Sequence, residues 1–282
     1  MGFKALEPED FVVSSDSVTS TVWSNNSPSL NTYFSSSTQK EGASGPYYLS
    51  VFQTASTSNQ AAVQFQIAYA NKNGGGGVDF DPAVPNVSPT STIYGQYRSL
   101  VLEDENSQFV FGSSFTGSGN DNAFYVVSIE RARYKQSLLP GSLNLILSSS
   151  DTVNGYEKIH LTDNSNMVTL PIYYGTQRAY QLISGSDGSA YTGDGYTPAS
   201  GSYGLFLPDI STLLLNAAAL DDNSLNGGGI NLQTNSGSNT AGQNPTKLFL
   251  HISGSNGDVN GNAFLLNSQE TLTSDFVFIR AR

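Results

Sequence analysis

Short apolar and aromatic runs recur along the whole chain, and turn-forming residues separate them. In residues 63–69 the large apolar side chains take every odd position, and residues 143–147 repeat this period of two. Period two is typical of a β-strand with one buried and one solvated face, because successive side chains point to opposite sides. The pattern predicts strands here and in four further runs, residues 47–52, 124–129, 248–252 and 276–279.

Helical patterns are scarce. Residues 213–220 are rich in alanine and follow a possible cap, so they predict one or two helical turns. Residues 94–102 are ambiguous, although their aromatic and β-branched neighbours favour a strand. Ser, Thr and Asn dominate the polar positions, and these side chains disfavour helix interiors. We therefore predict an all-β fold of tandem β-sandwich or jelly-roll-like domains with long polar loops.

A weak internal sequence repeat suggests how the chain divides into domains. Asn-Ala-Phe at residues 122–124 precedes a strand that ends in Arg-Ala-Arg, and residues 262–264 repeat this with a longer insertion. Residues 135–141 contain a Pro-Gly pair typical of a boundary. We predict an N-terminal β domain with a docking arm at residues 1–135 and a second β domain at residues 136–282.

Composition excludes several classes of function. Charged residues are 12% of the chain, against about 25% in ordinary soluble domains. The net charge is −11, and 12 scattered Lys and Arg residues give no basic face for a nucleic acid. Cysteine is absent, which removes disulfides and thiolate chemistry. Without a signal peptide or a long apolar stretch, the chain is expected to be made in the cytoplasm and to stay out of membranes.

Candidate catalytic and metal-binding residues are few. His160 and His251 lie far apart in the sequence and no Gly-x-Ser-x-Gly motif accompanies them, so structural roles are expected. The acidic clusters at residues 79–81, 103–105 and 221–222 each follow a strand or helix end, where carboxylates usually cap loops. We predict no enzymatic activity, no catalytic residue, no cofactor and no metal.

One loop region leaves alternatives open. Residues 186–188 and 193–195 form the best candidate calcium loop, but the regular Asp-x-Asp-x-Asp-Gly array is missing. Tyr191, Tyr196 and Tyr203 lie in or near this region. Tyrosine suits both sugar stacking and subunit contacts, and we rank the subunit contact first.

Two further features suggest subunit contacts. An arm near the N-terminus joins Phe3, Leu6 and Phe11 to an acidic run, and it is expected to dock on another subunit or on its own domain. The paired arginines of each Arg-Ala-Arg would share one face of an extended strand. These arginines are expected to bind acidic loops of the same or a neighbouring subunit, or to be solvated at a strand end and discourage edge pairing. The four residues are Arg131, Arg133, Arg280 and Arg282.

Several segments give the chain a family resemblance. The whole chain resembles a virion structural protein of marine T4-like myoviruses, including cyanophages. The segments that carry the resemblance are residues 3–11, 18–26, 94–102, 131–135, 139–141 and 274–282. Members of that family continue after the final Arg-Ala-Arg, so a longer native product is expected.

The resemblance implies a non-enzymatic component of a contractile tail, located in its baseplate. It implies a location in the virion tail, with other virion proteins and copies of the same chain as partners. No catalytic residue comes with it. The alternative is a tail module that binds a host receptor or surface glycan, or less plausibly hydrolyses a glycan.

Overall fold

The chain has an all-β architecture in this computed structural model, with 44% of residues in strands. The predicted fold class is confirmed. The structure describes residues 8–30, 34–36, 40–41, 45–77, 80–84, 87–111, 122–148, 158–190, 203–221, 229–237, 243–252 and 263–277.

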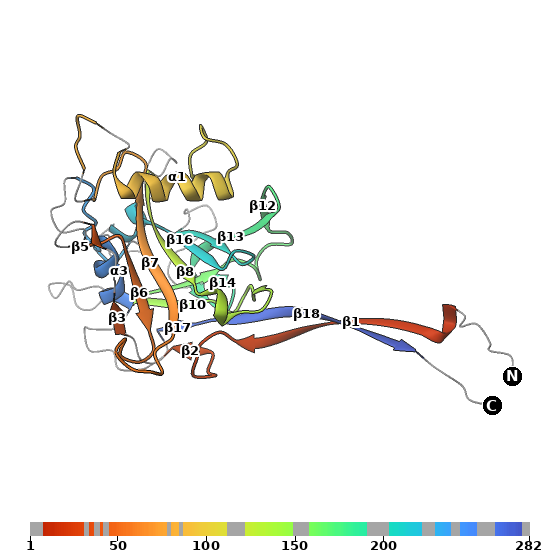
Figure 1. Cartoon of the computed structure of the whole chain (residues 1–282). Coiled ribbons are helices and arrows are strands. Elements are labelled where there is room, and N and C mark those ends of the chain that lie inside the picture. Colours follow the sequence, from red (N-terminus) through yellow and green to blue (C-terminus); the bar gives the residue numbers. More distant parts are fainter. Residues whose placement is uncertain are drawn as a thin grey trace, which may run out of the picture.

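One large antiparallel sheet forms the body of the molecule (Figure 1). Two short strands, β12 (Ile172–Tyr174) and β14 (Ser189–Ala190), pair with β13 beside its main path. Along that path the order is β2 (Ser29–Leu30), β17 (Phe264–Leu265), β10 (Asn144–Ser148), β11 (Lys158–Asp163), β13 (Gln177–Ser186), β15 (Gly204–Leu207), β16 (Thr212–Asn216), β8 (Ala123–Ile129), β7 (Val63–Asn71), β6 (Tyr48–Phe52) and β3 (Phe34–Ser36).

Smaller elements complete the fold. A second sheet has the order β1 (Phe11–Thr21), β18 (Asn267–Val277), β9 (Ser137–Leu138), and a third joins β4 (Lys40–Glu41) to β5 (Gly45–Pro46). The helical elements are η1 (Pro8–Asp10), α1 (Pro89–Val101), η2 (Arg131–Arg133), α2 (Ala217–Asp221) and α3 (Asn244–Ile252).

The central strands of the main sheet are buried on both faces. In β8, Tyr125 and Val127 belong to the larger core cluster, while Phe124 and Val126 belong to a second cluster under α1. This explains why Ala70, on the face of β7 expected to be solvated, is fully buried in the second cluster. Gln64 is fully buried for another reason: it lies at the irregularity in the β6–β7 pairing, and its side chain is hydrogen-bonded to Ser24 and Ala62.

The main sheet curls until its two ends face each other. Phe264 of β17 and Phe65 of β7 are far apart in the strand order, yet their ring centroids lie 5.3 Å apart. Trp23 contacts both rings, at 5.0 Å from Phe264 and 6.1 Å from Phe65. Edge-to-face aromatic contacts of this kind stabilise a buried core. The larger core cluster therefore fills the inside of the curl.

Residues 94–102, for which a strand was favoured, are mostly helical, so that prediction was wrong. Pro89 stands at the first turn of α1, where its missing N–H costs no hydrogen bond. Thr90, Tyr94 and Val101 form the buried side of the helix, and α1 contacts β7. The aromatic residues are explained by this packing rather than by strand propensity.

Two other assignments also need correction. Residues 248–252 were predicted as a strand but belong to α3, where Leu248 and Ile252 are buried at helical spacing. In residues 213–220 the helix begins only at Ala217, because the preceding residues form β16 between β15 and β8. The side chain of Asn216 accepts a hydrogen bond from Ala218 N at 3.0 Å and so marks the helix start.

The strand pairing crosses the predicted division at residue 135. β8 pairs with β16, and β1 pairs with β18, so each of these pairs joins the first half of the chain to the second. The second copy of the sequence repeat is also divided between two sheets, since β17 lies in the main sheet and β18 in the second sheet. The two halves therefore do not form separate sheets.

Candidate functional site

A two-stranded ribbon projects from the body and is the main candidate site (Figure 1). β1 and β18 pair antiparallel along their full length, from Thr21 opposite Asn267 at the body to Phe11 opposite Val277 at the tip. Each strand has 11 residues, which at about 3.3 Å per residue gives a length of roughly 36 Å.

Local sequence explains why the ribbon is extended. Thr recurs in both strands and Val recurs in β1, and β-branched residues favour pleated backbone. At the base, the Ser20 and Ser268 hydroxyls are hydrogen-bonded across the pair at 2.7 Å. β9 adds a short third strand there, and the Gln136 side chain accepts a hydrogen bond from Thr271 N at 2.8 Å. Beyond this base, β18 is the only strand that pairs with β1 within the described structure.

The ribbon tip exposes a group of large apolar side chains. Val13 is 67% exposed and Phe276 is 51% exposed. Phe11, Val12 and Val277 are each almost half exposed. Exposed apolar groups of this kind, next to unpaired strand edges, usually mark a contact with another protein.

The two faces of the ribbon differ in chemistry. Cross-strand partners share a face, so Val12 lies with Phe276, Asp16 with Leu272, and Val18 with Glu270. We call this set the apolar-acidic face of the ribbon; it comprises Val12, Asp16, Val18, Glu270, Leu272 and Phe276. The opposite face carries apolar residues and Asp275 at its tip, where Asp275 pairs with Val13, and it carries Ser, Thr, Gln and Asn along the rest of its length.

Residues 131–135 form a basic segment near the base of the ribbon, immediately before β9 in the chain. We define it by Arg131, Arg133 and Lys135. The Arg131 guanidinium lies 4.8 Å from the centre of the Tyr134 ring, and its Nη1 donates to Tyr134 O at 2.8 Å. Among the described residues, no carboxylate pairs with any of the three cations.

Arg131 and Arg133 do not lie on an extended strand, so the prediction was wrong for this pair. Residues 131–133 form the 3-10 helix η2, in which positions two apart point in different directions. Accordingly, Arg131 is exposed and Arg133 is half-buried. The chain turns here because Ile129 ends β8 and Arg133 N bonds back to Glu130 O at 2.8 Å.

The other predicted contact residues have mixed outcomes. Phe11 lies at the exposed ribbon tip. Tyr203 is 1% exposed and belongs to the larger core cluster, so it is not available as a surface contact. The remaining predicted contacts lie outside the described residues; they are Phe3, Leu6, Tyr191, Tyr196, Arg280 and Arg282.

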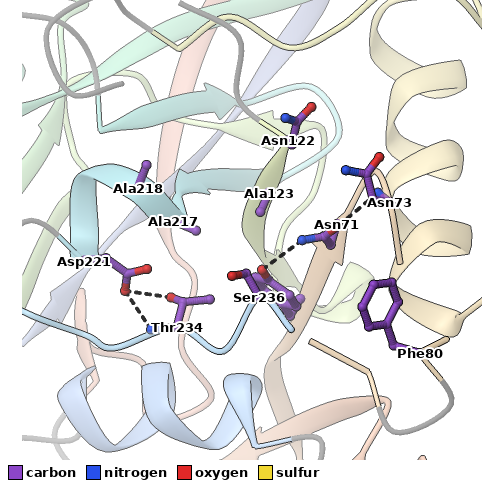
Figure 2. Close-up of a pocket in the computed structure, with 11 residues that line it drawn as sticks. Asn71, Asn73, Phe80, Asn122, Ala123, Ala217, Ala218, Asp221, Thr234 and Ser236 are labelled. Atoms are coloured by element: carbon purple, nitrogen blue, oxygen red, sulfur yellow. Dashed lines mark hydrogen bonds between the residues drawn. The ribbon is translucent and has the colours of Figure 1, made fainter. Parts of the chain in front are cut away.

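An amide-lined pocket of about 450 Å³ is the second candidate site (Figure 2). It lies where β7, β8 and α2 end, and its lining includes Asn73, Asn122 and Phe80. Asn71 shapes its wall, because its Oδ1 accepts hydrogen bonds from Asn73 N at 2.9 Å and Gly75 N at 3.2 Å. The pocket thus combines amide side chains with two aromatic residues, Tyr69 and Phe80.

The glycine run at residues 74–77 is explained by close packing at this pocket. A Cβ at Gly75 would lie 2.0 Å from Ser236 O, and Gly74 has a φ of +85°. Gly76 N donates to Gly237 O at 2.8 Å, which holds the two loops together. These glycines allow the backbones to approach one another, and no Lys-Ser/Thr pair follows for phosphate binding.

Asp221 is the only acidic side chain among the described residues that line the pocket. Its Oδ1 accepts hydrogen bonds from Thr234 N and Thr234 Oγ1, both at 2.8 Å. Burial raises the pKa of Asp221, although the Thr234 hydrogen bonds partly oppose this. The pocket therefore offers hydrogen-bonding groups but, within this lining, no pair of opposed carboxylates for glycoside hydrolysis.

Several of the remaining acidic candidates form hydrogen bonds or turns within their own loops. Asp81 and Asp104 cap their own loops through Ala83 N and Asn106 N. Asp187 and Gly188, in the candidate calcium loop, form the turn between β13 and β14, with φ values of 51° and 77°. The described residues contain no cluster of three potential metal ligands. Asp79 and residues 193–195 lie outside the described residues.

The two histidines occupy different elements. His160 lies in β11. His251 lies in α3 rather than in the predicted strand, and its Nδ1 is 2.7 Å from Lys247 O. Desolvation lowers the pKa of His251, and its Nε2 is buried without a hydrogen-bond partner.

No helix of the described structure is long and apolar enough to cross a membrane. Comparisons of the chain with protein-family models, with curated proteins and with solved structures find no match.

Proposed function

We propose that this chain is a non-enzymatic structural component of a contractile-tailed phage particle, located in the tail baseplate, and that the ribbon is its docking arm. The observation that carries the proposal is the projecting pair β1–β18, with apolar side chains exposed on both faces of its tip. Other virion proteins and further copies of the chain are the proposed partners. The chain is made in the host cytoplasm and resides in the virion tail.

The physical properties of the ribbon favour a docked state. An isolated two-stranded ribbon is marginally stable in water, because it buries little apolar surface. Monomeric proteins usually protect exposed strand edges with Lys or Pro, and neither occurs in β1 or β18. Contact with a neighbouring subunit would cover both the apolar tip and the free edge. The low charge content of the chain also suits extensive subunit contacts.

The proposal can be tested in particles of a phage that encodes this chain. A ribbon variant, Val12→Ser with Phe276→Ser, is compared with a body-surface variant, Val110→Ser with Leu170→Ser. All four side chains are exposed, so neither variant should unfold the monomer. We expect the parent and the body variant to co-purify with particles, and the ribbon variant to be lost from them.

Two results would contradict the proposal. One is that the parent chain is absent from purified particles by mass spectrometry. The other is that the ribbon variant is incorporated as well as the body variant.

The amide-lined pocket favours a second candidate function, the binding of a neutral glycan. Asn side chains beside a ring are the groups that hold and stack a sugar. Titration of the purified chain with host polysaccharide tests this, with Asn73→Ala as the pocket variant and Asn106→Ala as the control. Absence of binding by the parent chain would remove this candidate.

A further inference from the structure

We propose that the apolar-acidic face of the ribbon docks on the basic segment, Arg131, Arg133 and Lys135, of a second copy of this chain. The inference rests on the proposed function, in which the ribbon is a docking arm, and it names the partner of that arm.

The ribbon carries negative charge only. Asp16, Glu270 and Asp275 are its ionisable residues, and β1 and β18 contain neither Lys nor Arg. Asp16 and Glu270 lie on the same face, next to Val18 and Leu272. A complementary surface must therefore present cations together with groups that can cover apolar side chains.

The basic segment has these properties. In a chain with 12 Lys and Arg residues and a net charge of −11, three cations lie within five positions here. Arg131 and Lys135 are exposed, and Tyr134 between them is half-buried with its ring against the Arg131 guanidinium. Guanidinium groups bind carboxylates in a two-pronged geometry, while an aromatic ring can cover aliphatic side chains.

The ribbon of the same chain does not satisfy these cations. No ion pair between the basic segment and Asp16, Glu270 or Asp275 occurs among the described residues. The exposed cations Arg131 and Lys135 can therefore accept a carboxylate from another copy, which offers the exposed Asp16 and the half-buried Glu270 on one face.

Pairing of two ribbons with each other is less favourable. Antiparallel pairing of β1 with its copy, centred on the strand, would place Asp16 opposite Asp16. Like charges directly across a strand pair are destabilising. The resulting four strands would also contain six carboxylates and no cation from β1 or β18. Charge complementarity thus selects the basic segment over a second ribbon.

Contact between two different surfaces of the same chain has a geometric consequence. Each copy offers a ribbon to one neighbour and a basic segment to another, so the contact is head-to-tail. Such contacts close into rings when the rotation between copies permits, and otherwise continue as open assemblies.

The test uses two charge-reversed chains and sedimentation analysis at up to about millimolar concentration. One chain carries Asp16→Lys with Glu270→Lys, and the other carries Arg131→Glu with Arg133→Glu. We expect the parent to self-associate, and each variant alone to have a dissociation constant raised tenfold or more. Mixed in equal amounts, the two variants should associate again, because each junction regains opposite charges.

A matched control reverses two cations elsewhere, Lys72→Glu with Lys158→Glu, and should self-associate as the parent does. A monomeric parent, variants that associate normally, or a mixture that stays dissociated would each overturn the inference. Incorporation of the parent into particles in that case would leave the proposed function standing, with a different partner for the ribbon. Absence from particles would contradict the proposed function independently.

Discussion

The ribbon and the body are built from the same kind of antiparallel strand but differ in what covers them. β7 in the body has core clusters on both faces: Phe65 and Ile67 belong to the larger cluster and Ala70 to the second, and all three are fully buried. β1 in the ribbon pairs along its whole length with β18, yet almost every side chain is exposed. Backbone pairing alone contributes little net stability, because water offers the same hydrogen bonds. The body is stabilised by its core, whereas the ribbon needs a partner.

The largest loss of stability is expected when the aromatic contact that joins the two ends of the curled sheet is removed. Phe65→Ala should lower the free energy of unfolding by about 3–5 kcal/mol, because it leaves a cavity beside Trp23 and Phe264. Urea denaturation measures this, with Phe65→Leu as the milder control. A loss below about 1 kcal/mol would show that this contact does not hold the body together.

A smaller effect is expected at the Arg178–Asp209 ion pair of the body. The Asp209 carboxylate accepts from Arg178 Nη2 at 2.6 Å and from Arg178 N at 3.0 Å. Both side chains are more than a quarter exposed, so Asp209→Ala should cost only about 1–2 kcal/mol. Asp16→Ala in the ribbon is the matched control and should leave chemical denaturation of the monomer unchanged. Equal losses in both variants would contradict the contrast between body and ribbon.

A pH-dependent effect is expected in the body and not in the ribbon, because neither β1 nor β18 contains histidine. Burial lowers the folded-state pKa of His251 below its ordinary value of about 6.5. The folded state therefore favours the neutral ring, and this contribution to stability is present above pH 6.5 and is lost as the pH falls toward the folded-state pKa.

The measurement is the midpoint of thermal unfolding at a series of pH values from 7.5 to 5.5. The thermal midpoint of the His251→Gln variant should decrease less on acidification than that of the parent. The His160→Gln variant keeps His251 and serves as the control. Identical pH profiles for His251→Gln and the parent would exclude this role of His251.

The smallest change in the stability of the monomer is expected for a substitution at the ribbon tip. Phe276→Ala should change the unfolding free energy of the monomer by no more than about 0.5 kcal/mol, because the ring is half exposed. Chemical denaturation at low protein concentration measures it. A loss comparable to that of Phe65→Ala would mean that the tip is part of the body's core.

Some of the fold follows directly from local sequence. The alternation in residues 63–69 and 143–147 correctly predicts β7 and β10, because strand periodicity is a local property. The errors at α1 and α3 have a common origin. Leu248 and Ile252 are apolar positions that fit a strand or a helix equally well, and only packing against the sheet decides between them.

The candidate site was less predictable. The apolar residues of the N-terminal arm predicted docking, which stays a prediction, and among them the structure places Phe11 at an exposed tip. The strand partner of the arm could not be predicted, because β1 and β18 are about 250 positions apart and pairing over that distance leaves no local signal. The apolar-acidic face exists only through this register, since Asp16 and Glu270 share a face by pairing.

By itself, the sequence determined the all-β class and the apolar arm, since periodicity and composition act within a few residues. The tertiary structure decided three other features. It curled one sheet around a core that includes residues from both halves of the chain, it placed Tyr203 inside that core, and it brought β1 and β18 together as a ribbon. The physical reason is that burial and cross-strand pairing are non-local. They depend on which distant segment covers a strand: core clusters cover β7 on both faces, whereas nearly all of β1 is exposed.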